Sequence, residues 1–341
     1  MIQTDDSVLS QLILHNIRSA ENRSILSEQT INFEEEIDSA LLKKIFLKPF
    51  SNQTTTFEFQ HKINLEYNVL FSLAKAIYEE ADFTEQSIKI AEHLIENSKH
   101  PNIKDGDLFI AKFEDIQLNN KHYQGLGIYK FEEKESFIET SVRAKEISIE
   151  LRKGIGNKKP DKACLILFTD EPYTLLIIDN NSNETEYWQE DFINHKAKND
   201  FVNNTTNFLT LTKEFITGQI PQEYEVSKAD QIDLLNRSVD YFKSNETFDK
   251  NDFEQSVFQD KGIIKSFRNF DQNFQEQHEL ELSDSFEIST QAVKKQARAF
   301  KSVLKLDKNF HIYIHGDREL IEQGTDKDGR KFYKIYYEAE T

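Results

Sequence analysis

The chain of 341 residues has little of what builds cross-linked, flexible or membrane-spanning proteins. It contains one cysteine, so no disulfide can form within it, which fits a reducing compartment. Glycine (10) and proline (5) are scarce, whereas phenylalanine (27) and tyrosine (12) are frequent, so regular elements around an aromatic core are expected. No apolar run approaches the ~20 residues that span a bilayer. The sequence therefore predicts a soluble, cytoplasmic protein with no membrane partner.

The motifs of common enzyme classes are also missing. There is no Gly-x-Ser-x-Gly elbow, no P-loop and no Rossmann fingerprint, and Cys164 lies in an apolar run that predicts a buried, unreactive thiol. His311 and His315 would lie ~13 Å apart on a strand, too far to share a metal ion. Pro160 and Asp161 resemble the first acid of a nuclease, but no acidic-x-Lys partner follows. We therefore predict no catalytic residue, metal ligand or cofactor.

The first part of the chain combines strand and helix patterns. Residues 9–17 and 24–33 have the character of short strands, and residues 34–47 that of a helix. Two further helices, over 65–77 and after a cap at Thr84, are expected to pack on a sheet. Six runs with short turns between them predict that this sheet is antiparallel: 107–113, 123–131, 136–142, 147–151, 163–168 and 173–179.

A domain boundary is predicted where a phenylalanine-rich helix over 191–216 ends at Gly218. The domains are then residues 1–218 and 219–341. Residues 222–288 carry 7 Lys/Arg against 16 Asp/Glu, a net charge of −9, and their apolar stripes predict helices.

The end of the chain is expected to contain a basic helix and a β meander, with a final hairpin turn at 326–329. The predicted fold class is therefore α+β: an antiparallel-sheet domain with packed helices, followed by an acidic helical segment, a basic helix and a small β meander.

Residues 289–308 form a basic strip, with six basic residues and one acidic residue in a chain whose net charge is −18. Their spacing predicts one amphipathic helix whose apolar and cationic stripes lie ~100° apart. The apolar stripe consists of Val293, Ala297, Phe300 and Leu304, and the proposed phosphate contacts are Lys294, Lys295, Arg298, Lys301 and Lys305. The alternative is a solvated helix face whose lysines balance nearby carboxylates.

A second basic cluster, which includes Arg152 and Lys162, surrounds the loop 154–157. Glycines at 154 and 156 allow such a loop to approach a phosphate backbone. Lys153, Lys158 and Lys159 are therefore further candidates for nucleic-acid contact. An ordinary exposed hairpin loop is the alternative.

Several segments spread over nearly the whole chain share a family pattern: Leu12–Ile17 with Leu26–Glu28, Gly106–Phe113, Leu126–Lys130, Asp191–Ile193 and Leu306–Ile314. In these segments the chain resembles the bacterial nucleoid-associated protein family. The resemblance implies a non-enzymatic protein that associates with the chromosome in the cytoplasm. It supplies no catalytic or binding residues, so the site prediction depends on the charge pattern alone.

Together these observations predict a nucleoid-associated protein that binds duplex DNA through a localised basic patch. The net charge of −18 opposes broad coating of DNA, so any contact must be local. One alternative is an acidic interaction or DNA-mimic module that acts on a DNA-processing protein. A Mg²⁺-dependent nuclease is the second alternative, and a homo-oligomer is left open.

Overall fold

The chain forms two compact units in the computed structural model, Met1–Lys198 (unit 1) and Asn199–Thr341 (unit 2). The structure describes residues 2–18, 24–33, 36–53, 55–100, 102–143, 146–156, 158–180, 187–278, 280–298, 300, 303–314 and 318–339. The division precedes the predicted boundary at residue 218, because helix α4 (Phe201–Glu214) buries Phe208 in the core of unit 2. Across the described ranges, no helix is long and apolar enough to cross a membrane.

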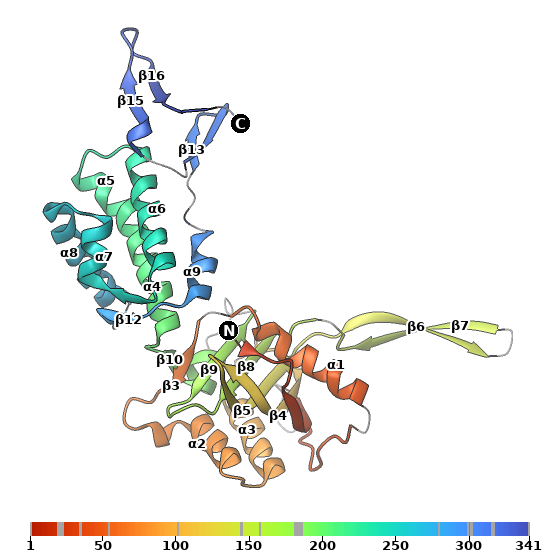
Figure 1. The fold of residues 1–341 in the computed structure, drawn as a ribbon. Helices are drawn as coiled ribbons and strands as arrows, with labels where there is room; N and C mark the ends of the chain where they lie inside the picture. Colours follow the sequence, from red (N-terminus) through yellow and green to blue (C-terminus); the bar gives the residue numbers. More distant parts are fainter. Residues whose placement is uncertain are drawn as a thin grey trace. The chain divides into compact units, whose positions relative to one another are not determined.

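Unit 1 is built on an eight-stranded antiparallel sheet (Figure 1). The strand order is β1-β4-β5-β8-β9-β3-β10, and β2 also pairs with β4. Four of the six strands predicted from the short-turn pattern, β4, β5, β8 and β9, form its centre. The strands are β1 (Ile2–Gln3), β2 (Val8–Ile17), β3 (Phe57–Phe59), β4 (Gly106–Leu118), β5 (Lys121–Phe131), β8 (Lys162–Leu167), β9 (Thr174–Asp179) and β10 (His195–Ala197).

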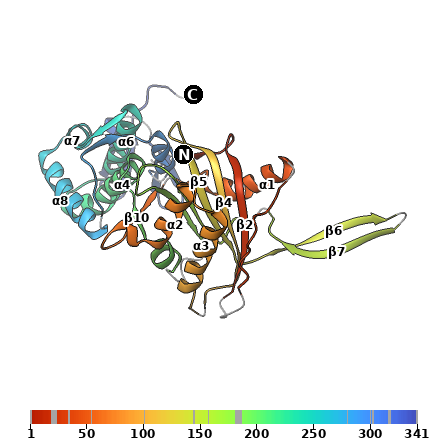
Figure 2. The same ribbon diagram turned by 90° about the horizontal axis from the view of Figure 1, so that it is seen from below.

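Helices cover both faces of this sheet. Helices α2 (Val69–Tyr78) and α3 (Phe83–Asn97) pack on one face, and α1 (Glu36–Leu47) packs on the other, as Figure 2 shows. Successive strand residues point to opposite faces, so β5 contributes Ile128 to the α2 and α3 side and Tyr129 to the α1 side. This double burial explains the continuous apolar runs of β8 and β9. The predicted α+β class is confirmed.

Cys164 lies on the α2 and α3 side of the sheet. Its side chain is fully buried, and burial raises the pKa of its thiol. A thiol that stays protonated is a poor nucleophile, so the structure agrees with the predicted buried, unreactive cysteine.

Two predictions near the N-terminus are wrong in detail. Residues 24–33 form only an isolated bridge between Ile25 and Asn16, because the backbone N–H of Ser27 donates to His15 Nδ1 instead of to a strand. Helix α3 is capped by Asp82, which accepts from the Glu85 N–H at 2.7 Å, and not by Thr84. Before α2, residues 65–67 form a short 3-10 turn.

The other two predicted strands, β6 (Glu135–Arg143) and β7 (Glu146–Gly154), pair only with each other. Both figures show them as a long two-stranded ribbon apart from the main sheet. This ribbon lies in the sequence between β5 and β8, which pair directly in the sheet. We call it the β6–β7 arm.

Unit 2 is organised around an aromatic core. Its helices are α4, α5 (Ile220–Glu223), α6 (Lys228–Ser244), α7 (Lys250–Val257), α8 (Lys261–His278) and α9 (Thr290–Ala297). Phe248 is stacked between Phe242 and Phe286, with ring centroids 5.3 and 4.6 Å away. The predicted helices of the acidic segment are present, and Ser227 and Asp230 form a capping box at the start of α6. A short ribbon of β11 (Thr247–Asp249) and β12 (Ser285–Glu287) interrupts them.

The end of the chain forms two separate ribbons rather than one meander. The strands β13 (Val303–Leu306) and β14 (Phe310–Tyr313) make the first, and β15 (Ile321–Thr325) and β16 (Lys331–Ile335) make the second. The turn predicted over 326–329 is confirmed, since Gly329 adopts a φ of 81° and its N–H donates to the Asp326 carbonyl.

The prediction of one basic helix over 289–308 is wrong. Helix α9 ends at Ala297, and residues 303–306 pair with β14 instead. A strand is possible here because Leu304 and Leu306 alternate with Val303 and Lys305, so the ribbon directs both leucines toward one apolar cluster. Val293 and Phe300 belong to the main core of unit 2, and Leu304 belongs to this smaller cluster.

Acid is expected to destabilise unit 1 through the buried His15. Its Nδ1 accepts the Ser27 N–H, so Nε2 carries the proton and donates to Ser87 Oγ at 3.2 Å. Burial lowers the pKa of His15 from 6.5 to about 4. Below pH 6.5 the unfolded chain therefore binds protons that the folded chain does not, and stability falls as the pH drops toward 4. The loss due to His15 should reach about 2 kcal/mol between pH 7 and pH 5.

Urea unfolding at pH 7 and pH 5 measures this effect. The variant His15→Gln should lose part of the difference between the two pH values, whereas His122→Gln on the surface should retain it. An unchanged pH dependence in His15→Gln would show that another group causes the acid sensitivity.

Candidate nucleic-acid interface

The predicted cationic face of residues 289–308 is divided between a helix and a ribbon. Lys294 and Lys295 lie exposed in the last turn of α9, where the helix dipole favours cations, and the exposed Arg298 follows in a turn. Lys305 lies on β13, opposite His311 of β14. Lys301 lies outside the described residues. Of the four described cations, Lys294, Lys295 and Arg298 therefore lie together on one short segment.

Buried contacts fix the position of this segment in unit 2. Ser289 caps α9 by accepting from the Ala292 N–H, and its own backbone N–H donates to Thr205 Oγ1 at 3.0 Å. Val293 is 2% exposed. Among the described residues, no carboxylate pairs with Lys294 or Arg298, so their charges face solvent without a compensating anion.

A pocket in unit 1 gathers lysines that are far apart in the sequence. Lys44 and Lys48 come from α1 and the turn that follows it, and Lys158 and Lys159 come from the segment between β7 and β8. The cavity has a volume of about 490 Å³. Its other lining residues are Ile45, Pro49, Ser51 and Asn52. We call it the lysine pocket.

The wall formed by α1 is held by aromatic packing. Phe46 stacks on Tyr129 at 4.5 Å between ring centroids, and Phe50 is fully buried beside the same ring. Tyr129 fits there because position 127 is glycine, since a Cβ on Gly127 would lie 2.2 Å from the Tyr129 hydroxyl oxygen. The backbone that carries Lys44 and Lys48 is therefore anchored to the sheet.

Hydrogen bonds hold the opposite wall. Asn180 donates from Nδ2 to the Pro160 carbonyl at 2.9 Å, and Asp161 accepts the Glu132 N–H at 2.8 Å. The half-buried Lys158 is 3.3 Å from Asp161 and 3.5 Å from Glu133, so both carboxylates restrain it.

The remaining pocket lysines carry uncompensated charge. Lys44, Lys48 and Lys159 are exposed, and none of them forms an ion pair with a described carboxylate. An excess of positive charge in a concave site, with the nearby Ser51 and Asn52 as polar groups, suits a bound anion of phosphate size.

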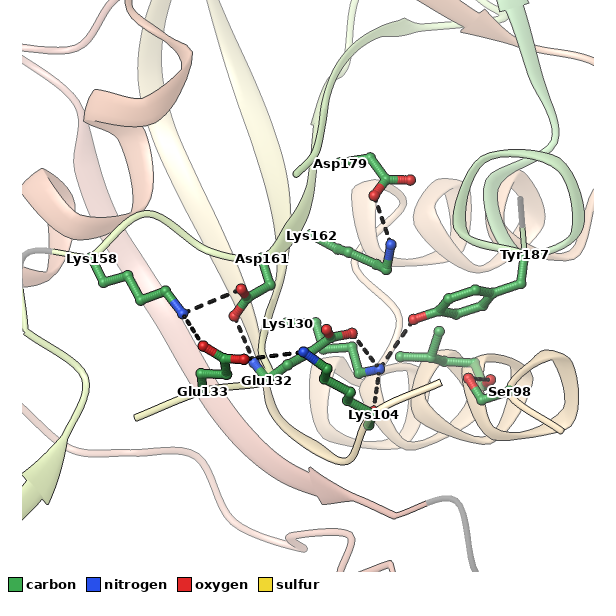
Figure 3. Close-up of polar contacts among 11 residues, drawn as sticks. Ser98, Lys104, Lys130, Glu132, Glu133, Lys158, Asp161, Lys162, Asp179 and Tyr187 are labelled. Atoms are coloured by element: carbon green, nitrogen blue, oxygen red, sulfur yellow. Dashed lines mark hydrogen bonds and ion pairs between the residues drawn. The ribbon is translucent and has the colours of Figure 1, made fainter. Parts of the chain in front are cut away.

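A buried charged cluster lies beside this wall, and Figure 3 shows its contacts. Lys162 and Asp179 form an ion pair of 2.6 Å, with side chains only 3% and 2% exposed. Lys130 donates to Glu132 and to the Tyr187 hydroxyl, both at 3.0 Å. Burial lowers the pKa of Lys130, and the charge of Glu132 opposes that shift. Lys162 belonged to the predicted second basic cluster, but it is enclosed here and unavailable to DNA.

The other members of the second cluster separate in space. Lys153 is exposed on β7, on the same face of the arm as Ser136, whereas Lys158 and Lys159 line the pocket. The side chain of Arg152 pairs with Glu139 and Glu150. Only part of the predicted cluster therefore forms one site.

The acids near Pro160 do not form a metal site. Asp161 accepts a backbone N–H and pairs with Lys158. Within the described part of the chain, no group of three or more His, Cys, Asp or Glu side chains is placed to hold a metal ion. The nuclease alternative therefore has no metal centre in this part of the molecule.

Sequence reasoning missed Lys44 and Lys48. Lys48 directly follows the predicted helix over 34–47, four residues after Lys44, and this spacing was the available signal. Their convergence with Lys158 and Lys159 depends on tertiary packing, because α1 covers the sheet face next to the β7–β8 segment.

Comparison with protein-family models matches residues 13–341, nearly the whole chain, to the family described as nucleoid-associated protein YejK. Comparison with curated proteins finds no match.

Proposed function

Because the chain belongs to the nucleoid-associated protein YejK family, we propose that it binds duplex DNA directly, through localised basic surfaces. The family is bacterial and generally non-enzymatic, and membership implies association with the nucleoid, in the cytoplasm, and a part in chromosome organisation. The proposal adds the mode of contact and the residues that make it.

The lysine pocket is the observation that carries the proposal. Three exposed lysines and one restrained lysine converge on a cavity of about 490 Å³ from two rigid walls. Lysines held in this way neutralise backbone phosphates and release their counterions, which supplies most of the affinity of sequence-independent DNA binding. Since the chain as a whole carries a net charge of −18, contact is confined to such places.

A second surface is proposed on unit 2. Lys294, Lys295 and Arg298 lie exposed within one turn of α9 and its end, and Lys305 is exposed on β13. Lys153 on the arm and Lys301 complete the set of proposed phosphate contacts. The described members of this set are secondary to the pocket because they are divided among α9, β13 and the arm.

The test is a salt titration of duplex DNA binding by fluorescence anisotropy, from 50 to 200 mM salt. The triple variant Lys44→Gln, Lys48→Gln and Lys159→Gln should lower the slope of log K against log salt by about 3, since each lost phosphate contact removes about 0.9. The variant Lys294→Gln, Lys295→Gln and Arg298→Gln should lower the slope by a smaller amount.

A matched control changes the net charge equally at other exposed lysines of unit 1. Lys62→Gln, Lys89→Gln and Lys121→Gln should leave the slope within about one contact of the wild type. An equal loss in the control and the pocket variant would show that overall charge, and not the pocket, governs binding. Absence of duplex binding by the wild-type protein at 50 mM salt would overturn the proposal.

The acidic segment supports a second candidate function, in which the protein engages a basic DNA-processing protein. Residues 222–288 carry a net charge of −9, and the excess acidic residues lie in the segments outside helices α6, α7 and α8. Part of this charge is used internally, since Arg268 pairs with Glu254 at 2.6 Å and Lys250 pairs with Asp271 at 2.6 Å. Retention of a bound partner after nuclease treatment would support this function, and loss of the partner would favour direct DNA binding.

A further inference from the structure

The two faces of the β6–β7 arm differ in chemistry. The strand register places Ile138 opposite Leu151, Thr140 opposite Ile149 and Val142 opposite Ile147, so these six side chains share one face. The five aliphatic members of this set are 60–80% exposed: Ile138 60%, Val142 71%, Ile147 77%, Ile149 68% and Leu151 80%. We call this surface the aliphatic face.

The opposite face is mostly polar, although Phe137, which is 49% exposed, also lies on it. Arg152 pairs with Glu139 and with Glu150, and the hydroxyl oxygens of Ser141 and Ser148 lie 2.8 Å apart. This face is therefore suited to water, and the aliphatic face is the side that needs cover.

An isolated two-stranded ribbon is marginally stable in water at best. The arm has 9 residues in each strand, and within the described residues neither strand pairs with anything but the other. A contiguous aliphatic surface of this kind is characteristic of a protein–protein contact.

The charge of the arm indicates which partner fits. Residues 135–154 contain four acidic and four basic residues, so the arm is neutral within a chain of net charge −18. Apart from a single contact by Lys153 at its base, a neutral arm gains little from the field of DNA, and two copies of an acidic protein approach each other with least repulsion through a neutral surface.

The size of the aliphatic face also fits a second copy. Burial of the five side chains removes roughly 300–600 Å² of surface from each arm, as the transfer energies of such side chains imply. Two arms together then bury roughly 600–1,200 Å², and the upper part of this range reaches the roughly 1,000 Å² of a specific interface. In a dimer with two-fold symmetry, both copies contribute the same face to the interface, so the dimer requires no other surface of the protein.

We propose that the β6–β7 arm is a dimerisation element that packs its aliphatic face against the aliphatic face of a second copy of this chain. The two ribbons stack as layers about 10 Å apart, as packed sheets do. The arms' polar faces remain in water on the outside of the pair.

The full-length protein should behave as a dimer in size-exclusion chromatography with light scattering at micromolar concentration. The variant Ile147→Thr, Ile149→Thr and Leu151→Thr places β-branched, strand-forming residues at all three positions but removes aliphatic area, so the dimer should dissociate at least about 100-fold more readily. The matched variant Ser141→Thr and Ser148→Thr changes the polar face and should leave the dimer intact.

Cysteine cross-linking keeps the proposal testable even if the triple variant folds poorly. The single native cysteine is buried, so an introduced thiol is the accessible one. Thr140→Cys places a thiol on the aliphatic face and should give a disulfide-linked dimer on mild oxidation, whereas its neighbour Ser141→Cys on the polar face should remain largely monomeric.

Three results would overturn the proposal. The first is a wild-type protein that stays monomeric at tens of micromolar, and the second is a dimer that survives the triple substitution. The third is equal cross-linking of Thr140→Cys and Ser141→Cys. None of these measurements involves DNA, so their outcome is separate from that of the DNA-binding proposal.

Discussion

Replacement of Asp179 by asparagine is expected to lower the free energy of unfolding of unit 1 by about 3–5 kcal/mol. The carboxylate of Asp179 is 2.6 Å from Lys162 Nζ, and both side chains are almost completely buried. Loss of one charge leaves the other without compensation in a medium of low polarity. Lys130 increases the effect, because its ammonium group lies near that of Lys162. The two groups lie over the ring of Tyr187, at 5.5 and 5.2 Å from its centroid, so two like charges remain close together when Asp179 is lost.

The single tryptophan makes this measurement specific to unit 1. Trp188 is fully buried in the core on the α2 and α3 side of the sheet, so its fluorescence during urea unfolding reports on that unit. The control Glu85→Gln breaks an exposed ion pair with Lys89 and should cost no more than about 0.5 kcal/mol.

A double variant tests the physical cause. Lys162→Met combined with Asp179→Leu removes both charges and should recover much of the loss. A cost for Asp179→Asn that is no larger than that of Glu85→Gln would show that water reaches the pair and screens it.

Truncation of Phe248 to alanine is expected to destabilise unit 2 by about 3–5 kcal/mol. Phe248 is fully buried, and its ring centroid lies within 6.1 Å of five other aromatic rings, those of Phe208, Tyr241, Phe242, Phe253 and Phe286. The substitution leaves a cavity at the centre of this cluster. Since most of the surrounding rings are held by helices, the site collapses only in part.

Unfolding of unit 2 is followed by far-ultraviolet circular dichroism, since α4 to α9 contain most of the helical residues among those that the structure describes. The matched control Phe310→Ala removes the same side chain from the terminal ribbon, where it is 61% exposed, and should stay within about 0.5 kcal/mol. Equal costs for the two substitutions would contradict the central place of Phe248.

Periodicity was sufficient to predict most elements but not their partners. All six strands between residues 107 and 179 are present, yet the pattern gave no means to separate the β6–β7 arm from the main sheet. An alternating strand reveals that it has an apolar face, and it does not reveal what covers that face. Here the structure shows that the arm's apolar face stays exposed.

The basic strip illustrates a different limit. Val303, Leu304 and Lys305 satisfy both the helical spacing of the preceding segment and the alternation of a strand. Pairing with residues 310–313, which depends on contacts after the turn, decides between the two. Local sequence patterns could not predict the lysine pocket either, because its walls come from distant segments that the sheet brings together.

The position of the arm in the sequence has a consequence for how this fold can change. Lys130 near the end of β5 is paired with Lys162 at the start of β8, so the arm leaves and re-enters the sheet at adjacent points. An ordinary tight turn is long enough to join β5 to β8 at these adjacent points. The length of the arm therefore does not affect the register of the two strands. Insertion, shortening or complete loss of the arm is therefore open to evolution and to the protein engineer without any change to the hydrophobic layers of the sheet.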